Sequence, residues 1–256
     1  MKTLGILAAG VLAVLGGFGL AAGPAAAEGT IVACDDEVGW PPYTYVEDGA
    51  VKGASAEIAR ELFRRAGYRL EFRMAPWKRC LAAVESGEHP LTINATHSEE
   101  RARTFLLSTP YYSVGSALFY AKARFPDGVA LASVAEMGRY SYCGMAGYNY
   151  SMYPIPAEKL DTGSKDERSR IAKLHAGRCD FVIGDREVLS GFAALGMLDL
   201  SGIAHTPIPG DRPKAFHMLI SRAATGGEAM QKLVNDGLAA MRADGSLQAI
   251  MARHGM

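Results

Sequence analysis

Hydrophobic residues between positions 30 and 95 follow two different spacings in turn. Runs with the alternating or continuously apolar character of β-strands lie at 30–34, 69–74 and 91–95. Between them, residues 54–66 and 77–86 have the spacing of amphipathic helices, and a glycine suited to a helix end follows each run, Gly67 and Gly87. Strands and helices in alternation predict a parallel sheet that is covered by helices on both faces.

The second half of the chain repeats this pattern between two strands that leave one lobe and return to it. Residues 116–122 form the leaving strand and residues 215–221 the returning strand. Between them we expect strands at 139–144 and 180–184. Two helices should begin at sequences with capping-box spacing and end at a glycine: Ser133 with Glu136 before Gly138, and Ser164 with Glu167 before Gly177.

Two crossings between lobes imply a hinge. A C-terminal helix and the short segment after it should close the first lobe with the apolar residues Met230, Leu233, Val234, Leu238, Met241, Leu247, Ile250 and Met251. The sequence therefore predicts an α/β protein with a first lobe made of residues 28–119 and 216–256 and a second lobe made of residues 120–215.

The N-terminus has the pattern of an export signal. Lys2 precedes an apolar run over residues 4–22, and the small residues Ala25, Ala26 and Ala27 suit a signal peptidase. We expect a signal peptide at residues 1–27, with cleavage after about Ala27 and export of the rest. The alternative is an uncleaved membrane anchor, which the five glycines of the run and its alanine-rich end disfavour. The absence of a cysteine at the cleavage point argues against a lipid anchor.

Charge excludes several classes of partner. The chain carries 27 Lys and Arg against 27 Asp and Glu, so that loss of Lys2 with the signal would leave a net charge of about −1. No basic stripe is present, which argues against a nucleic-acid or anionic-membrane partner.

The six histidines show no close pairing, and no Gly-x-Ser-x-Gly sequence occurs, so we expect neither a metal site nor a serine hydrolase.

The residues with candidate chemistry all follow the ends of predicted strands, where open α/β sheets bind ligands. They can therefore converge on one cleft. They are Trp40 and Tyr43 after the first strand, Trp77 after the second, Asn94, Thr96 and Arg101 after the third, and Tyr148, Asn149 and Asp185 in the second lobe.

The order of these residues resembles the periplasmic solute-binding proteins of the polar-amino-acid type, the bacterial extracellular solute-binding proteins of family 3, which deliver ligands to ABC transporters. The resemblance covers nearly all of the chain after the signal. It is carried by residues 40–45 (WPPYTY), Gly53, Pro76, Trp77, Thr96, Glu100, Arg101, residues 110–112 (PYY), residues 177–185 (GRCDFVIGD) and residues 243–247 (ADGSL). It implies the two-lobed type II fold with a mostly parallel sheet in each lobe. It also implies a periplasmic location, a monomer without a cofactor, and a permease as partner.

The resemblance assigns roles to individual residues. Arg101 would pair with a ligand carboxylate, helped by Thr96, and a carbonyl or the side chain at Asn94 would meet an amino group. The alternative for Arg101 is an exposed helix arginine among glutamates. Asp185 would pair with a ligand ammonium, or cap the helix that follows, or do both. Trp40, Tyr43 and Trp77 would form ligand-stacking walls, with core packing as the alternative.

One segment departs from the pattern of the family. Gly147 stands where the family has a glycine followed by hydroxyl residues at a helix N-terminus. The next residues here are Tyr148 and Asn149. A bulky tyrosine would shrink the pocket or replace a ligand contact, so the resemblance leaves the identity of the ligand open.

Four cysteines remain after loss of the signal, and an oxidising compartment favours disulfides. Three pairings are possible in principle. Because Cys34 and Cys80 fall in the first lobe and Cys143 and Cys179 in the second, one bridge within each lobe is the simplest expectation. The alternative is buried thiols that act as small hydrophobic residues.

The leading hypothesis from the sequence is a periplasmic protein that closes on a small amino-acid-like or carboxylate solute and delivers it to an ABC transporter permease. A second hypothesis is an enzyme on the same scaffold, similar to the periplasmic cyclohexadienyl dehydratases, with Asp36, Glu37 or His97 as general acid. A third is a sensor whose closed form docks on a receptor.

Overall fold

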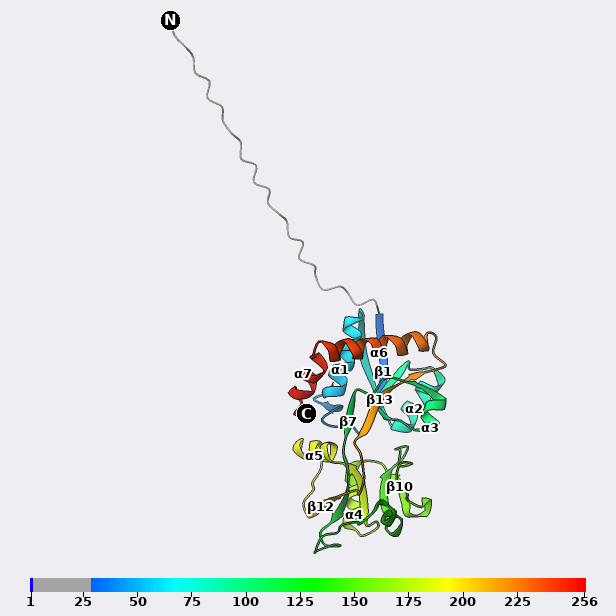
Figure 1. The fold of residues 1–256 in the computed structure, drawn as a ribbon, viewed down its shortest axis with the longest axis vertical. Helices are drawn as coiled ribbons and strands as arrows, with labels where there is room; N and C mark the ends of the chain where they lie inside the picture. Colours follow the sequence, from blue (N-terminus) through cyan, green and yellow to red (C-terminus); the bar gives the residue numbers. More distant parts are fainter. Residues whose placement is uncertain (2–28) are drawn as a thin grey trace.

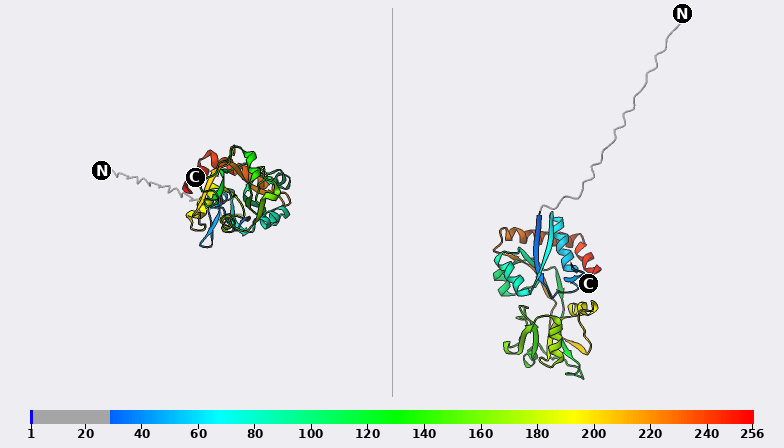
Figure 2. Two further views of the ribbon diagram at one scale, coloured as in Figure 1. Left: turned by 90° about the horizontal axis from the view of Figure 1, so that it is seen from below. Right: turned by 180° about the vertical axis from the view of Figure 1, so that it is seen from behind.

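The computed structural model describes residue 1 and residues 29–256. Within this part, two α/β lobes are stacked end to end and joined by two extended segments (Figure 1). The view from behind shows the same two lobes, with helices along the flanks of the sheets, whereas in the view from below the lobes overlap (Figure 2). The predicted signal peptide lies outside the described residues.

The first lobe contains a sheet in the order β4-β1-β5-β13-β6, with β7 also paired to β13. β1 runs parallel to β4 and β5, whereas β13 runs antiparallel to β5, β6 and β7. The strands are β1 (Gly29–Asp36), β4 (Tyr68–Ala75), β5 (Leu91–Thr96), β6 (Phe105–Leu107), β7 (Tyr112–Val114) and β13 (Lys214–Ser221). A separate hairpin consists of β2 (Tyr45–Glu47) and β3 (Ala50–Lys52).

Helices cover both faces of this sheet because its strands alternate their side chains between the faces. Ile31 and Ala33 of β1 belong to the core under α1 (Ala54–Arg65), α6 (Gly227–Ala243) and α7 (Ser246–Arg253). Cys34 belongs to a second cluster under α2 (Trp77–Ser86). The predicted helix at 77–86 is confirmed, and it ends at Gly87, whose φ of 85° is the left-handed conformation that favours glycine.

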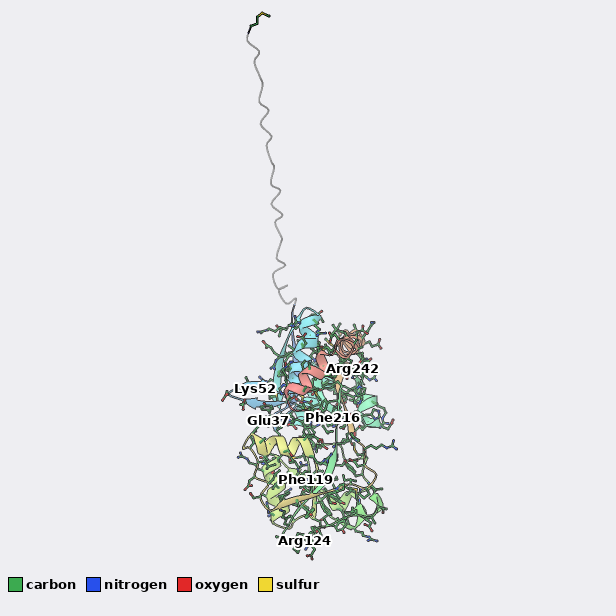
Figure 3. The ribbon with its side chains drawn as sticks, turned by 60° about the vertical axis from the view of Figure 1, so that its left-hand side comes forward. Glu37, Lys52, Phe119, Arg124, Phe216 and Arg242 are labelled. Carbon is green, nitrogen blue, oxygen red and sulfur yellow. A yellow bond between two sulfur atoms is a disulfide. The ribbon has the colours of Figure 1, made fainter. Side chains whose placement is uncertain are left out.

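The second lobe contains a sheet in the order β10-β9-β11-β8-β12. Its strands are β8 (Ser116–Ala121), β9 (Tyr142–Met145), β10 (Leu160–Ser164), β11 (Phe181–Asp185) and β12 (Ile203–Pro207). Its helical elements are α4 (Glu167–His175), α5 (Arg186–Ala194) and the short 3-10 helices η1 (Val134–Arg139) and η2 (Ala157–Lys159). Phe119 of β8 lies inside this lobe, and Arg124 lies at its far end (Figure 3).

Both sheets are mixed, which corrects the expectation of mostly parallel sheets. The strands on either side of the hinge cause the difference. β8 enters the second sheet antiparallel to β11, and β13 returns to the first sheet antiparallel to β5. Because all of β8 belongs to the second sheet, the first crossing lies at Gly115, a few residues before the expected boundary at 119/120.

Three local predictions in the second lobe are wrong. α4 is capped by Asp166, which forms a capping box with Ser169, rather than by Ser164 with Glu167. Gly138 lies inside η1 instead of ending a helix, and the side chain of Ser133 makes no capping hydrogen bond. η1 extends to Arg139, so the expected strand at 139–144 begins only at Tyr142.

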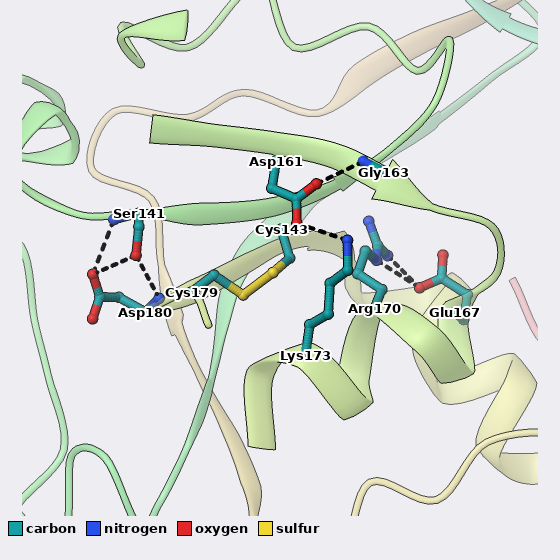
Figure 4. The surroundings of a disulfide bond; sticks show 9 residues. All are labelled: Ser141, Cys143, Asp161, Gly163, Glu167, Arg170, Lys173, Cys179 and Asp180. Atoms are coloured by element: carbon teal, nitrogen blue, oxygen red, sulfur yellow. Dashed lines mark hydrogen bonds and ion pairs between the residues drawn. A yellow bond between two sulfur atoms is a disulfide. The ribbon is translucent and has the colours of Figure 1, made fainter. Parts of the chain in front are cut away.

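The four cysteines pair within the lobes, as expected. Cys34 of β1 is bonded to Cys80 of α2, and Cys143 of β9 is bonded to Cys179 just before β11. The second bridge lies beside two ion pairs of α4, Lys173 with Asp161 and Arg170 with Glu167 (Figure 4).

No helix in residues 29–256 combines the length and the apolar character that crossing a membrane requires.

Candidate functional site

A cleft with a cavity volume of about 70 Å³ lies where the two lobes meet. It is lined by residues at the C-terminal ends of β1, β5 and β11, by the beginning of α2 and of β13, and by the segment after β9. Phe216 of β13 belongs to this lining and lies at the junction of the lobes (Figure 3). The lining contains all of the predicted ligand residues except Tyr43: Trp40, Trp77, Asn94, Thr96, Arg101, Tyr148, Asn149 and Asp185.

Arg101 presents a buried positive charge to this cleft. It lies on the short helix α3 (Glu99–Thr104), which Ser98 caps, and is only 8% exposed. Its Nη1 donates to the carbonyl and the hydroxyl of Thr96, both at 2.9 Å, and its Nη2 donates to the Gly147 carbonyl of the other lobe at 3.4 Å. Burial lowers the pKa of Arg101 to about 10, so it stays charged at neutral pH.

Every partner of Arg101 is neutral. No carboxylate in the described part of the chain lies within 4.0 Å of its guanidinium. The ring of Trp77 lies beside it, with the centroid 5.7 Å from Cζ. A buried guanidinium that lacks a counter-ion is costly, and a carboxylate from outside the protein would supply the missing charge with suitable geometry. The exposed-arginine alternative is therefore wrong.

Asp185, the last residue of β11, is 3% exposed and faces the same cleft. Its Oδ1 accepts a hydrogen bond from the Ser116 hydroxyl at 2.8 Å and forms an ion pair with Lys214 Nζ at 2.6 Å. Its Oδ2 is buried and has no partner among the described residues. The carboxylate does not cap α5, because its side chain makes no capping hydrogen bond.

Lys214 was not predicted as a site residue. It is the first residue of β13, directly before the strand expected at 215–221, and the pattern of apolar residues gives no sign of its partner. Its ammonium group pairs with Asp185, the carboxylate that the resemblance expects to bind the ammonium group of a ligand.

The side chain of Asn94 is engaged inside the first lobe, which leaves its backbone carbonyl as the group that could meet a ligand amine. Nδ2 donates to Asp35 and to the Thr44 hydroxyl, both at 2.7 Å. Oδ1 accepts from the hydroxyls of Tyr111 and Tyr112, at 3.2 and 2.8 Å. The backbone of Asn94 has a φ of 62°, a conformation that asparagine tolerates better than most residues. The side chain therefore holds Asp35 in place instead of meeting a ligand amine.

Two adjacent carboxyl groups at the end of β1 also face the cleft. Burial is the main cause that raises the pKa of Asp35 to about 8, so its protonated form predominates at neutral pH. Burial also raises the pKa of Asp36 to about 6. Asp36 accepts a hydrogen bond from the Tyr148 hydroxyl of the other lobe at 3.0 Å and from the Val38 amide at 3.2 Å.

The two tryptophans and the tyrosine have different positions. Trp40 and Trp77 line the cleft, and Trp40 packs edge-on against Tyr148 of the second lobe, with ring centroids 5.9 Å apart. Tyr43 is 2% exposed and stacks on Tyr112 with centroids 4.1 Å apart. The expectation that Tyr43 forms a ligand wall is wrong, because it lies in the core of the first lobe.

Tyr148 and Asn149, the two departures from the family pattern, connect the lobes. Tyr148 reaches Asp36, and Asn149 Nδ2 donates to the His97 carbonyl at 3.0 Å. Both side chains therefore lie between the lobes and line the cleft. That the tyrosine shrinks the pocket stays a prediction.

Arg170 is a further cleft residue that the sequence analysis missed. Its Nη2 pairs with Glu167 at 2.5 Å, its Nη1 donates to the Ile183 carbonyl at 3.1 Å, and both charged residues are 3% exposed (Figure 4). The spacing of three residues on a helix was the available signal. Because Glu167 already balances its charge, Arg170 differs from Arg101.

Other chemistry has little support in the described residues. No group of three or more His, Cys, Asp or Glu that could hold a metal ion occurs in residues 29–256. Of the three acids considered for catalysis, Asp36 lines the cleft, whereas Glu37 is exposed and lies outside the cleft lining. His97 borders a neighbouring hollow.

Comparisons with known proteins bear on the family and on the fold. The family model of the bacterial extracellular solute-binding proteins, family 3, matches residues 31–256. The L-cystine-binding protein TcyJ of Escherichia coli (strain K12) is 28% identical over 217 residues, which cover 82% of this chain and 77% of the relative. A probable histidine-binding protein of Neisseria gonorrhoeae is 20% identical over 95% of this chain and 90% of its own length.

Solved structures share the fold. An ancestral arginine-binding protein bound to arginine superposes with a TM-score of 0.71 at 18% identity, over 89% of this chain and 98% of the other. A histidine kinase sensor domain with similarity to periplasmic binding proteins superposes with a TM-score of 0.73 at 21% identity, over 88% of this chain and 95% of the other.

Proposed function

Since this chain belongs to the bacterial extracellular solute-binding proteins, family 3, we propose that it binds an amino acid or a related small carboxylate between its lobes. After loss of the signal peptide it acts in the periplasm as a monomer and delivers the solute to the permease of an ABC transporter. It needs no cofactor and performs no reaction on the ligand.

The observation that carries this proposal is the unmatched charge of Arg101. Thr96 and Gly147 fix the direction of the guanidinium but leave its charge without a counter-ion. A ligand carboxylate would complete the site with charge-assisted hydrogen bonds. The neighbouring Trp77 ring adds an aromatic wall.

Asp185 supports recognition of an amino group at the other side of the cleft. Its buried Oδ2 can accept from a ligand ammonium while Oδ1 keeps Ser116 and Lys214. A ligand with both groups would satisfy one residue of each lobe and so favour the closed arrangement. Because Lys214 shares this carboxylate, the ammonium contact contributes less than the carboxylate contact at Arg101.

The enzyme hypothesis is weaker than solute binding. Asp36 is the acid best placed for catalysis, and its carboxyl is already bound by Tyr148 and by the Val38 amide. The named relatives are binding proteins as well.

A binding screen with a matched pair of variants tests the proposal. The purified protein is screened by thermal shift against amino acids and organic acids, because a ligand raises the melting temperature by mass action. Hits are measured by calorimetry with the wild type, Arg101→Gln and Arg103→Gln. Loss of a charge-assisted contact costs on the order of 1.5 to 3 kcal/mol, so Arg101→Gln should weaken binding about tenfold to a hundredfold.

Arg103 is the control because it lies on the same helix but is exposed. We expect its variant to bind like the wild type. Equal affinity of all three proteins for a carboxylate ligand would remove Arg101 from the site, and a screen without any amino-acid or carboxylate hit would refute the proposed ligand class.

The partner is tested separately from the ligand. A pull-down from membranes with ligand-bound protein should retain a permease. If the pull-down retains a signalling receptor and no permease, the protein serves sensing and the proposed role in transport is wrong.

A further inference from the structure

The protein uses only one oxygen of the Asp185 carboxylate. Oδ1 is bound by the Ser116 hydroxyl and by Lys214 Nζ, whereas Oδ2 is buried and has no partner within residues 29–256. The side chain of Asp185 is 1% exposed. Because a buried acceptor without a partner is costly, Oδ2 requires a hydrogen-bond donor from outside the protein.

Lys214 determines which donor fits this position best. Its Nζ lies 2.6 Å from Oδ1 of Asp185, and its side chain is 14% exposed and lines the same cleft. The first lobe holds the lysine there, because its backbone pairs with Val114 between β13 and β7. Asp185 is its only ion-pair partner in the described part of the chain. Since an ammonium has three N–H donors, Lys214 can give a further hydrogen bond to a ligand.

Three groups at the α-carbon of a carboxylate ligand can be compared at this pair of residues. An ammonium can donate to Oδ2 of Asp185, but it cannot accept from Lys214, and two cations beside one carboxylate repel each other. An oxo group can accept from Lys214 but leaves Oδ2 without a donor. A hydroxyl can donate to Oδ2 and accept from Lys214 at the same time, and both of these hydrogen bonds are charge-assisted. Of the three groups, the hydroxyl alone satisfies both residues.

From this unpaired acceptor beside a lysine with donors to spare, we propose that the cleft prefers 2-hydroxy acids to the corresponding amino acids. The ligand carboxylate binds Arg101, and the ligand hydroxyl lies between Oδ2 of Asp185 and Nζ of Lys214. Amino acids can still reach Asp185, but they bind less tightly because of Lys214. This inference rests on the proposed function, because it keeps the same cleft and the same anchor and names the class of carboxylate that fits best.

Probes that differ only in the group at the α-carbon can test the preference by calorimetry. L-Lactate, L-3-phenyllactate and L-malate are each compared with the L-amino acid and the 2-oxo acid that have the same side chain. In every series that binds to the wild type, the hydroxy acid should bind about tenfold more tightly than either counterpart. The reason is that each counterpart loses one charge-assisted hydrogen bond and leaves Asp185 or Lys214 poorly matched.

Lys214→Met removes the ammonium and should reverse the preference. The buried carboxylate of Asp185 then lacks a cation, which the ammonium of an amino acid can supply. We expect the variant to bind the amino acid about tenfold more tightly than the wild type does, and the hydroxy acid about tenfold more weakly. Lys122→Met is the matched control, because Lys122 is an exposed lysine of the second lobe outside the cleft lining. It should bind all probes like the wild type.

The outcomes separate this inference from the proposed function. If amino acids bind as tightly as their hydroxy counterparts, or if they bind and none of the three hydroxy acids does, the preference is refuted and solute binding stands. A folded Lys214→Met variant that still favours hydroxy acids refutes it as well. If this variant does not fold, the comparison of probes on the wild type decides. If no amino acid or carboxylate binds at all, the proposed function fails, and this inference fails with it.

Discussion

Asp35 shows how strongly burial changes the chemistry of a single residue in this protein. It is 2% exposed and lies at the end of β1 beside Asp36. Its pKa is raised to about 8, mainly by burial, although hydrogen bonds from Asn94 and Thr44 act in the opposite direction. The folded protein therefore keeps a proton on Asp35 at pH values where the unfolded chain has already released it.

This proton makes stability depend on pH. Between about pH 4 and pH 8 the folded state binds more protons at Asp35 than the unfolded state, so the free energy of unfolding decreases as the pH rises. The contribution has a limit of about 1.4 kcal/mol per pH unit. We expect Asp35→Asn, which cannot ionise, to lose less stability than the wild type between pH 5 and pH 7.5 in urea denaturation.

Asp127→Asn is the matched control, because Asp127 is exposed in a turn. Its unfolding free energy should follow the wild type across the same range. If the free energy of unfolding changes with pH in the same way for the wild type and for Asp35→Asn, Asp35 is not a buried, protonated carboxyl.

Individual site residues differ in how far the sequence could predict them. The hydrophobic pattern placed Arg101, Asp185 and Thr96 at or just after the ends of strands, and the structure places all three in the lining of the cleft. Their ligand roles came from the family resemblance and stay predictions. The pairing of Asp185 with Lys214 and the use of Asn94 inside the first lobe were not found. Both depend on contacts between segments far apart in the chain, which the spacing of residues does not record.

At the scale of elements, α4 shows that capping is decided by backbone geometry. Asp166 accepts a hydrogen bond from the Ser169 amide at 2.7 Å, and the Ser169 hydroxyl lies 3.2 Å from the Asp166 amide. Ser164, the expected cap, is the last residue of β10, and its buried hydroxyl has no partner among the described residues. β10, a strand that the sequence analysis did not predict, includes Ser164, and the cap of the helix lies two residues later.

The two candidate caps can be compared directly. Asp166→Ala removes the side chain that binds the N-terminus of α4, and we expect a loss of about 1 kcal/mol in the free energy of unfolding. Ser164→Ala removes a hydroxyl without a partner and should be neutral or slightly stabilising. Chemical denaturation of both variants decides between them, and a larger loss for Ser164→Ala would support the cap expected from the sequence.

Long elements with a clear period were predicted well, and short ones were not. The helix at 77–86 has the observed bounds because a strong apolar face and Gly87 determine it. η1 is a single 3-10 segment whose residues fit the capping-box pattern without forming an α-helix. Short segments of this kind are determined mainly by their tertiary neighbours, which are absent from a local pattern.

At the scale of the whole molecule, the lobes touch outside the cleft as well. Gly191 of α5 faces the Pro41 segment of the first lobe, and a Cβ at this position would lie 2.7 Å from the Pro41 carbonyl oxygen. Since the obstructing atoms belong to the backbone, they cannot move aside as a side chain could. A glycine inside a helix, normally unfavourable, is therefore explained by the approach of the two lobes.

Gly191→Ala should separate the effects of folding and closure. Alanine favours the helix by roughly 0.5 to 1 kcal/mol, so α5 itself should not be weakened. The added methyl group should hold the lobes apart, giving a larger radius of gyration in small-angle scattering and weaker ligand binding. Ala194→Leu, at an exposed position of the same helix, should change neither quantity. If Gly191→Ala has the same radius of gyration as the wild type, the Pro41 segment moves to make room for the methyl group and the lobes are not held apart.

The two-lobed arrangement was predictable because one strand leaves the first lobe and another strand returns to it. Two such crossings imply two sheets joined by two segments of the chain. The sequence pattern located these strands near 116 and 215, close to β8 and β13. It did not predict that both would run antiparallel to their neighbours, because strand direction depends on which strands become adjacent in the folded protein.

The split first lobe has a consequence for biosynthesis. All strands of the second sheet lie within residues 116–207, whereas the first sheet needs β13, which the ribosome makes only afterwards. β13 sits between β5 and β6, so a nascent or prematurely terminated chain that ends before it carries two unpaired strand edges, a template for aggregation. The second sheet, by contrast, has all of its strands as soon as β12 has been made.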